Sequence, residues 1–263
     1  RAWNVPFMPF TFSNALKKES GLYVKDMYTE MAADLQKKWK EQLDTTTISP
    51  FEKVNTRLSK TYTDYLYPHQ MEDGSILAMK SGIGNIEELV KISNGKERKV
   101  FTPGIINVTG MLSVTNSRVV WNEYRYDPRW RVRTYSVIMG YDVGDKSQRI
   151  ISRNSRYAAA AISPDGYKVA TIESTTEYKT RLVVLDYFTG EVIKEFDNPE
   201  NDFIAMPCWD EKSSSIYALS TNINGKAIIK VDFPSGKVTP LTEYTAENVG
   251  YLLPVGEYIL FNS

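Results

Sequence analysis

One pattern recurs along most of this 263-residue chain: a turn built from Gly, Pro, Asn or Asp precedes a short strand rich in Val, Ile, Leu and Tyr. The strands that open each period begin at Ile76, Val119, Val169, Ile216 and Ile259, so consecutive starts lie 43, 50, 47 and 43 residues apart. A sheet of about four strands fits a period of roughly 40 to 50 residues, but alone it cannot bury both of its faces. Neighbouring sheets must therefore stack, and the period constrains the chain to a repeated β architecture.

Each period contains the same order of elements. A second strand follows the first, then a turn, then a last strand, and an acidic residue stands before the turn at Asp142, Asp186 and Asp232. We expect these carboxylates to accept hydrogen bonds from the free N–H groups of the turn. The alanine run at 158–161 is predicted to be an innermost strand, because small side chains fit where blades crowd a central axis.

These features predict a mainly β protein, a β-propeller with blades of four antiparallel strands. We count about four complete blades and part of a fifth, preceded by a short α-helical segment. The predicted division is a helical segment at 1–45, a linker at 46–60 and an incomplete propeller ring at 61–263. The blades are expected at about 61–104, 105–153, 154–201, 202–245 and, for the partial one, 246–263.

Two helices are predicted before the linker. Ser13 can act as the N-cap of a short helix over 14–19, and Gly21 stands where a helix end favours a positive φ. A longer helix is predicted from about Lys25 to Leu43. Apolar side chains recur on it every four residues, at Met27, Met31, Leu35, Trp39 and Leu43. We interpret this stripe as a packing face.

Charge and hydropathy exclude two classes of partner. Lys and Arg total 32, as do Asp and Glu, so the formal net charge is zero. Nucleic-acid binders normally need a basic face, so we expect no nucleic-acid partner. No run of about 18 apolar residues occurs, and we expect no membrane span. The chain begins at Arg1 without a start Met or a signal-peptide pattern, from which we expect a processed or excised polypeptide.

The single cysteine and the single histidine restrict the chemistry. Cys208 cannot form an internal disulfide, and His69 cannot build a His-based zinc site. We interpret Cys208 as a small buried hydrophobe and His69 as a turn residue. No serine lies in a G-x-S-x-G elbow, and the pair Gly82 and Gly84 precedes no helix that could hold a phosphate. We expect no catalytic residue, cofactor site or metal site here, and enzymatic activity stays an open question.

Residues 162–170, Ile-Ser-Pro-Asp-Gly-Tyr-Lys-Val-Ala, resemble the S-P-D-G signature of TolB-like (WD-repeat-like) propellers. In that family Pro and Asp-Gly form the tight turn between the first two blade strands. We interpret 68–74, 207–210 and 253–256 as degraded versions of the same turn. The resemblance covers about residues 60–263 and implies a TolB-like propeller located in the periplasm or at the cell surface.

Residues 121–136 are similar to a stretch of large TolB-like envelope proteins of Bacteroidetes. In such proteins a zinc-peptidase-like domain often precedes the propeller, and its closing helices resemble residues 12–18, Gly21 and the helix that contains Trp39. The resemblance implies that residues 1–45 are the C-terminal end of a peptidase-like domain. The HExxH helix of such a domain is absent from this sequence, so the resemblance assigns no catalytic residue.

The most unusual segment interleaves arginines with aromatic residues. The candidate partner-binding loop consists of Trp121, Glu123, Tyr124, Arg125, Asp127, Arg129, Trp130, Arg131, Arg133 and Tyr135. In one interpretation it binds an acidic or extended peptide, with Arg meeting carboxylates and the rings supplying contact area. In the other, Arg stacks on Trp and Tyr and pairs with Glu123 and Asp127, which pins a long hairpin loop.

These features favour two functions and disfavour a third. The first is a non-catalytic propeller module that binds a protein or peptide partner in the cell envelope, because propeller loops lie on a rigid frame. The second is an accessory domain that positions substrates for a larger peptidase or hydrolase. A sugar-binding or sugar-cleaving propeller would need paired carboxylates, which the period does not bring together. Unpaired strand edges invite pairing, so we also expect a homodimer or a parent-chain segment at the open blade edge.

Overall fold

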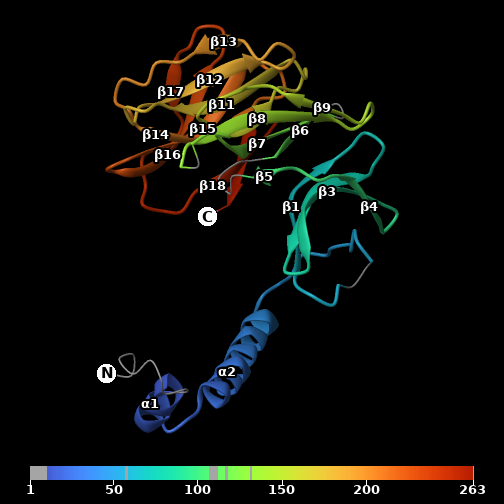
Figure 1. Ribbon diagram of the computed structural model, residues 1–263, viewed down its shortest axis with the longest axis vertical. Coiled ribbons are helices and arrows are strands. Elements are labelled where there is room, and N and C mark those ends of the chain that lie inside the picture. Colours follow the sequence, from blue (N-terminus) through green and yellow to red (C-terminus); the bar gives the residue numbers. More distant parts are fainter. Residues whose placement is uncertain (1–10, 57–58, 107–111, 116–117, 131, 263) are drawn as a thin grey trace. The chain divides into compact units, whose positions relative to one another are not determined.

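The computed structural model describes residues 11–56, 59–106, 112–115, 118–130 and 132–262 (Figure 1). The chain folds into two compact units, one ending at Glu52 and the other beginning at Lys53. The described part of the first unit contains the helices α1 (Thr11–Ser20) and α2 (Val24–Thr45). No helix in the described ranges is both long enough and apolar enough to cross a membrane.

The helices agree with the sequence except at one start. α1 begins at Thr11, so Ser13 lies inside its first turn, and the prediction of an N-cap at Ser13 is wrong. The reason is that Thr11 and Phe12 already belong to the helix, so Ser13 is a helical residue, whereas an N-cap residue has a non-helical backbone. Gly21 ends α1 as predicted, with φ +79° and its N–H donating to the carbonyl of Lys17 at 2.8 Å. On α2, Trp39 of the predicted packing stripe is 55% exposed.

Antiparallel sheets follow one another along the second unit, and strands adjacent in sequence pair within each sheet. The first blade consists of β1 (Thr63–Gln70), β2 (Ile76–Gly82), β3 (Asn85–Ser93) and β4 (Lys96–Phe101). The third blade consists of β10 (Tyr157–Ile162), β11 (Lys168–Ser174), β12 (Thr180–Asp186) and β13 (Val192–Glu195). The fourth blade consists of β14 (Phe203–Trp209), β15 (Ser215–Asn222), β16 (Gly225–Asp232) and β17 (Val238–Pro240).

The second and fifth blades vary this pattern. The second consists of β5 (Ile105–Ile106), β6 (Ser113–Thr115), β7 (Arg118–Tyr126), β8 (Thr134–Asp142) and β9 (Ser147–Ile150). Both β5 and β6 pair with β7, at its two ends, so together they take the place of a single innermost strand. The fifth blade contains β18 (Gly250–Val255) and β19 (Tyr258–Asn262). The predicted class, mainly β with four-stranded antiparallel blades after a short helical segment, is confirmed.

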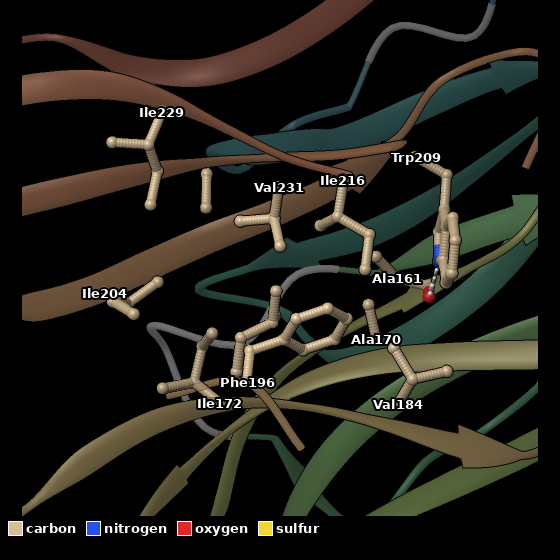
Figure 2. Close-up of a cluster of buried hydrophobic side chains, with 12 residues drawn as sticks. Ala161, Ala170, Ile172, Val184, Phe196, Ile204, Trp209, Ile216, Ile229 and Val231 are labelled. Carbon is tan, nitrogen blue, oxygen red and sulfur yellow. Dashed lines mark hydrogen bonds between the residues drawn. The ribbon is translucent and has the colours of Figure 1, made fainter. Parts of the chain in front are cut away.

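Blades stack through apolar side chains that alternate along each strand. On β7, Val119 packs toward the first blade, whereas its neighbour Val120 packs toward the third. Successive side chains of a strand point to opposite faces of its sheet. A strand of a blade that is packed between two other blades therefore carries apolar side chains on both faces. Figure 2 shows the cluster between the third and fourth blades, where Trp209 Nε1 donates a hydrogen bond to the carbonyl of Ala161 at 3.0 Å.

Innermost strands carry a bulge that the sequence pattern does not predict. The pairing register of β1, β10, β14 and β18 shifts around one residue with positive φ. These residues are Tyr67, Ala159, Met206 and Tyr251. A bulge leaves a residue unpaired, which accommodates proline without loss of a ladder hydrogen bond. In consequence Pro68 and Pro207 lie in strands, and their interpretation as part of a degraded turn is wrong.

The turn of the fourth blade begins later than the sequence analysis placed it. Asp210 N–H donates to the carbonyl of Ser215 at 3.0 Å, as Ser163 N–H donates to that of Lys168 at 2.8 Å. Asp210 is therefore the counterpart of Ser163, and the residues before it belong to β14. In the fifth blade Pro254 likewise lies in a strand, β18, and not in the turn.

Acidic residues before the outer turns act as predicted. Asp142 Oδ1 accepts hydrogen bonds from the N–H groups of Gly144 at 2.9 Å and Asp145 at 3.1 Å. Asp186 Oδ1 accepts hydrogen bonds from the N–H groups of Phe188 and Thr189, both at 2.8 Å. Asp232 accepts from the N–H of Ser235 at 2.8 Å. These caps satisfy turn N–H groups and fix the hairpins between the third and fourth strands.

Candidate functional site

The candidate loop is the far end of the hairpin formed by β7 and β8. The two strands pair without interruption from Arg118 opposite Asp142 to Tyr126 opposite Thr134. Beyond Tyr126, Asp127 N–H donates to the carbonyl of Arg133 at 2.9 Å and closes the loop. A continuous ladder of this kind presents the loop on a rigid support. Arg131 of the predicted set lies outside the described residues.

A carboxylate organises the loop itself. Asp127 Oδ1 accepts hydrogen bonds from the N–H groups of Arg129 at 2.8 Å and Trp130 at 3.0 Å, and the Tyr135 hydroxyl donates to Oδ2 at 3.3 Å. The N–H donors of Arg129 and Trp130 stabilise the charged form and lower the pKa of Asp127. Asp127 therefore acts as an internal cap of the loop and remains ionised at neutral pH.

A second carboxylate fixes the base of the hairpin. Glu123 is fully buried, and its Oε2 accepts hydrogen bonds from Trp121 Nε1 at 3.0 Å and from the N–H of Gly104 at 2.8 Å. Its Oε1 forms an ion pair with the guanidinium of Arg125. Trp121 is also buried, in the cluster between the first two blades. Neither Trp121 nor Glu123 is accessible to a partner, so they support the hairpin from beneath.

Accessible side chains of the loop are aromatic and basic. Tyr124 is 37% exposed, Tyr126 60% and Trp130 58%. The guanidinium of Arg129 lies 5.9 Å from the centroid of the Trp130 ring, and that of Arg133 lies 5.3 Å from the centroid of Tyr135. These contacts are the ones that the pinning interpretation expects. They hold the rings and the guanidinium groups in place while leaving them open to solvent.

His69 and Cys208, the two other residues considered in the sequence, both lie within strands. His69 pairs with Leu77 inside β1, so its interpretation as a turn residue is wrong, because the bulge extends β1 past Pro68. Cys208 lies in β14, and its burial raises the pKa of the thiol to about 12. Such a thiol remains protonated at neutral pH and contributes packing. Within the described ranges no three His, Cys, Asp or Glu side chains converge as metal ligands would.

A cavity between the first and second blades is not among the sites that the sequence predicts. Its volume is about 600 Å³, and residues from β1, the turn after it, β3, β6 and the turn after β8 line it. The polar part of the wall comes from His69, Glu72, Asp73 and Lys91, and the apolar part includes Val143. One signal in the sequence could have located this cavity. An aromatic residue follows the capping aspartate in the third and fourth blades, but valine follows it in the second.

Comparison with solved structures identifies the architecture. TolB from Agrobacterium tumefaciens matches 77% of this chain and 70% of its own, with a TM-score of 0.57 at 15% sequence identity. This chain has the fold of a TolB-like β-propeller. The TolB-like resemblance stated from the S-P-D-G turn is thereby confirmed at the level of the fold. Neither a scan against models of protein families nor a search of curated proteins finds a match.

Two further propellers resemble the chain over a smaller part of their own length. TolB from Acinetobacter baumannii matches 76% of this chain and 49% of its own, at 14% identity and a TM-score of 0.48. The propeller domain of the Trilobed protease from Pyrococcus furiosus matches 60% of this chain and 52% of its own, at 15% identity and a TM-score of 0.43. The TolB-like propeller thus spans about half the length of the Acinetobacter protein.

Proposed function

We propose that this TolB-like propeller is a non-catalytic module of the cell envelope that binds a protein or peptide partner through the end of the β7–β8 hairpin. The observation that carries the proposal is the combination of exposed Tyr126 and Trp130 with a loop held from within by Asp127. Exposed, preorganised aromatic side chains are the residues from which interfaces gain most, because little conformational entropy is lost on binding. The periplasmic or cell-surface location follows from the TolB-like resemblance and is part of the proposal.

Charge on this hairpin favours an acidic partner. Among the described residues, the ion pair of the loop is made by Arg125 with buried Glu123, and not by Arg129 or Arg133. Asp127 is committed to turn N–H groups. The two outer guanidinium groups therefore remain available to carboxylates, for which arginine offers a planar, bidentate fork. An extended segment with spaced Asp or Glu side chains fits this surface.

A binding titration tests the proposed function. The probe is a fluorescein-labelled peptide of alternating Glu and Ser, and the readout is fluorescence anisotropy at low ionic strength. We expect saturable binding that Trp130→Ala weakens at least tenfold, about 1.4 kcal/mol. The matched control is Tyr178→Ala, which removes an 88% exposed ring from the β11–β12 hairpin of the third blade. Absence of binding, or equal loss in both variants, would overturn the proposal.

An accessory role in a larger peptidase or hydrolase is the second candidate. The observation that favours it is the apolar stripe of α2, where Met31 is 50% exposed, Trp39 55% and Leu43 58%. An amphipathic helix normally buries such a stripe against another element. In this role the same hairpin would hold substrates for a neighbouring catalytic domain. A substrate peptide whose cleavage depends on Trp130 in a longer protein containing this chain would favour the accessory role.

For the open side of the fifth blade we propose a second copy of this chain as partner. Leu253 and Leu260 face away from the fourth blade and are 57% and 55% exposed. The pairs that correspond to them in the third blade, Ala161 with Ala170, are buried against the next blade. Two such faces can pack isologously. Sedimentation velocity should show a concentration-dependent dimer that Leu260→Lys dissociates; a monomer at every concentration would contradict this partner.

A further inference from the structure

Two interfaces between neighbouring blades, here called joints, contain the same contact at one end of the strands. A cation of the earlier blade lies against an aromatic ring of the later blade, and we call this contact the plug. Between the second and third blades, the guanidinium of Arg118 lies 5.2 Å from the ring centroid of Tyr187 and 4.8 Å from that of Phe188. It also donates a hydrogen bond to the carbonyl of Gly166 at 2.9 Å. A cation from the earlier blade and a ring from the later one thus fill the joint.

The joint between the third and fourth blades uses the same two positions. Lys168 Nζ lies 5.9 Å from the ring centroid of Phe233, which packs edge-on against Trp209 at 5.4 Å. Lys168 begins β11 as Arg118 begins β7. Phe233 follows its capping aspartate as Tyr187 does. The plug therefore recurs at these two successive joints, as one cation before the second strand and one ring after the outer cap, whereas the fourth blade has Ser215 at the cation position.

Both positions are changed at the joint between the first and second blades. The counterpart of Lys168 is Ser75, because Met71 N–H donates to the carbonyl of Ser75 at 2.8 Å as Ser163 N–H does to that of Lys168. The counterpart of the ring is Val143, which follows Asp142. The cavity of about 600 Å³ lies at this joint. Its size is within the roughly 300–1,000 Å³ that is typical of ligand sites.

The charged residues that line the cavity carry an excess of negative charge. Lys91 forms an ion pair with Asp73 at 2.6 Å, which leaves Glu72 outside the ion pairs of the described residues. Desolvation by neighbouring atoms lowers the pKa of His69, so its imidazole is neutral at pH 7. The lining charges are two carboxylates against one ammonium, a net charge of minus one. A wall of this charge attracts a single positive group.

We propose that the cavity between the first two blades is a binding site for an organic cation, an alkylguanidinium or alkylammonium group carried on an apolar stem. The cationic head takes the place that Lys168 and Arg118 occupy in the later joints and pairs with Glu72. The stem fills the space that Val143 leaves where the other blades have a ring. Two sources supply this chemistry: a free small amine or guanidine, and an Arg or Lys side chain of a peptide.

This site is separate from the hairpin end assigned to the partner. Val143 follows the last residue of β8, whereas Trp130 and Arg133 of the partner-binding loop precede its first residue. β8 contains nine residues, which separates the two ends by roughly 30 Å at about 3.3 Å per residue. Failure of one site would therefore leave binding at the other unchanged.

The test is a ¹H–¹⁵N correlation titration of the whole chain with Nα-acetylated arginine amide, and with Nα-acetylated citrulline amide as its uncharged counterpart, called arginine amide and citrulline amide below. We expect saturable shifts of the amides of Glu72 and Gly144 with arginine amide only. Glu72→Gln should weaken the affinity about fivefold, whereas Glu191→Gln, an exposed carboxylate of the third blade, should not. Val143→Phe, which supplies the missing ring, should abolish binding. The peptide acetyl-Gly-Arg-Gly-amide separates the sources, because tighter binding than arginine amide assigns the site to a peptide side chain.

Several results would overturn the proposal. They are the absence of saturable shifts with both cationic probes, equal binding of citrulline amide, and an affinity that Glu72→Gln leaves unchanged. If Val143→Phe impairs folding, the comparison of Glu72→Gln with Glu191→Gln still decides the outcome, because both substitutions are isosteric. Trp130→Ala serves as an internal control and should leave arginine amide binding unchanged.

Discussion

Replacement of Glu123 separates a structural role for this carboxylate from a role in partner binding. Glu123→Ala removes the acceptor of two buried donors, Trp121 Nε1–H and the N–H of Gly104. Each unsatisfied donor costs about 1–3 kcal/mol, so we expect a loss of about 2–6 kcal/mol in the free energy of unfolding. Glu123→Gln keeps a side-chain oxygen for both donors and loses only the charge that faces half-exposed Arg125, a loss of about 1 kcal/mol.

Urea unfolding followed by fluorescence or circular dichroism measures both losses, provided that the slope with urea stays constant. Arg125→Ala is the matched control, because it removes the ion pair but leaves both hydrogen bonds to Oε2. The expected order of stability is wild type, then Glu123→Gln and Arg125→Ala, then Glu123→Ala. A Glu123→Ala protein that loses less than about 1 kcal/mol while losing peptide binding would refute the structural assignment of this residue.

Four further perturbations test the fold and its caps. Gly190→Ala should destabilise far more than Gly256→Ala: both glycines have positive φ, which costs about 1–2 kcal/mol for alanine, but only at Gly190 would the new methyl overlap a carbonyl oxygen of the second blade. Trp209→Phe should cost about 1 kcal/mol in urea unfolding, because it removes one hydrogen bond between blades. Asp186→Asn should lower stability at pH 7, and the difference from wild type should shrink as pH falls through the acid range. The turn N–H groups lower the pKa of Asp186, so its contribution is present above the unfolded pKa of about 3.9 and is lost as pH falls through the folded pKa. The buried thiol of Cys208 should react with a thiol reagent at pH 8 only on the timescale of unfolding.

The period and the caps could be predicted because each depends on local rules. An aspartate before a turn captures the next free N–H groups whichever blade it belongs to, and Asp186 and Asp232 follow that rule. The bulges could not be predicted. Tyr67 and Met206 take positive φ although neither is a glycine, and no local signal marks them. For the same reason the sequence does not distinguish Pro207, which lies at a bulge, from Pro164, which lies in a turn.

The candidate site was predictable in composition but not in accessibility. Trp121 and Glu123 are part of the same run of residues as Trp130, yet they are buried and Trp130 is exposed. Burial of Glu123 depends on Gly104, which is distant in sequence and meets it only through the pairing of β5 with β7. The cavity depends on the absence of an aromatic ring at Val143. This absence is recognised only when the blades are compared with one another.

Mapping where an acidic peptide binds tests the central claim most directly. The measurement is the change in backbone amide chemical shifts of the whole chain when the Glu-Ser peptide is added to saturation. The account predicts that the largest shifts fall between Tyr124 and Tyr135 and are reduced in Trp130→Ala at the same peptide concentration. Shifts centred on another blade, or the same shifts in wild type and Trp130→Ala, would contradict the assignment of the β7–β8 hairpin as the binding surface.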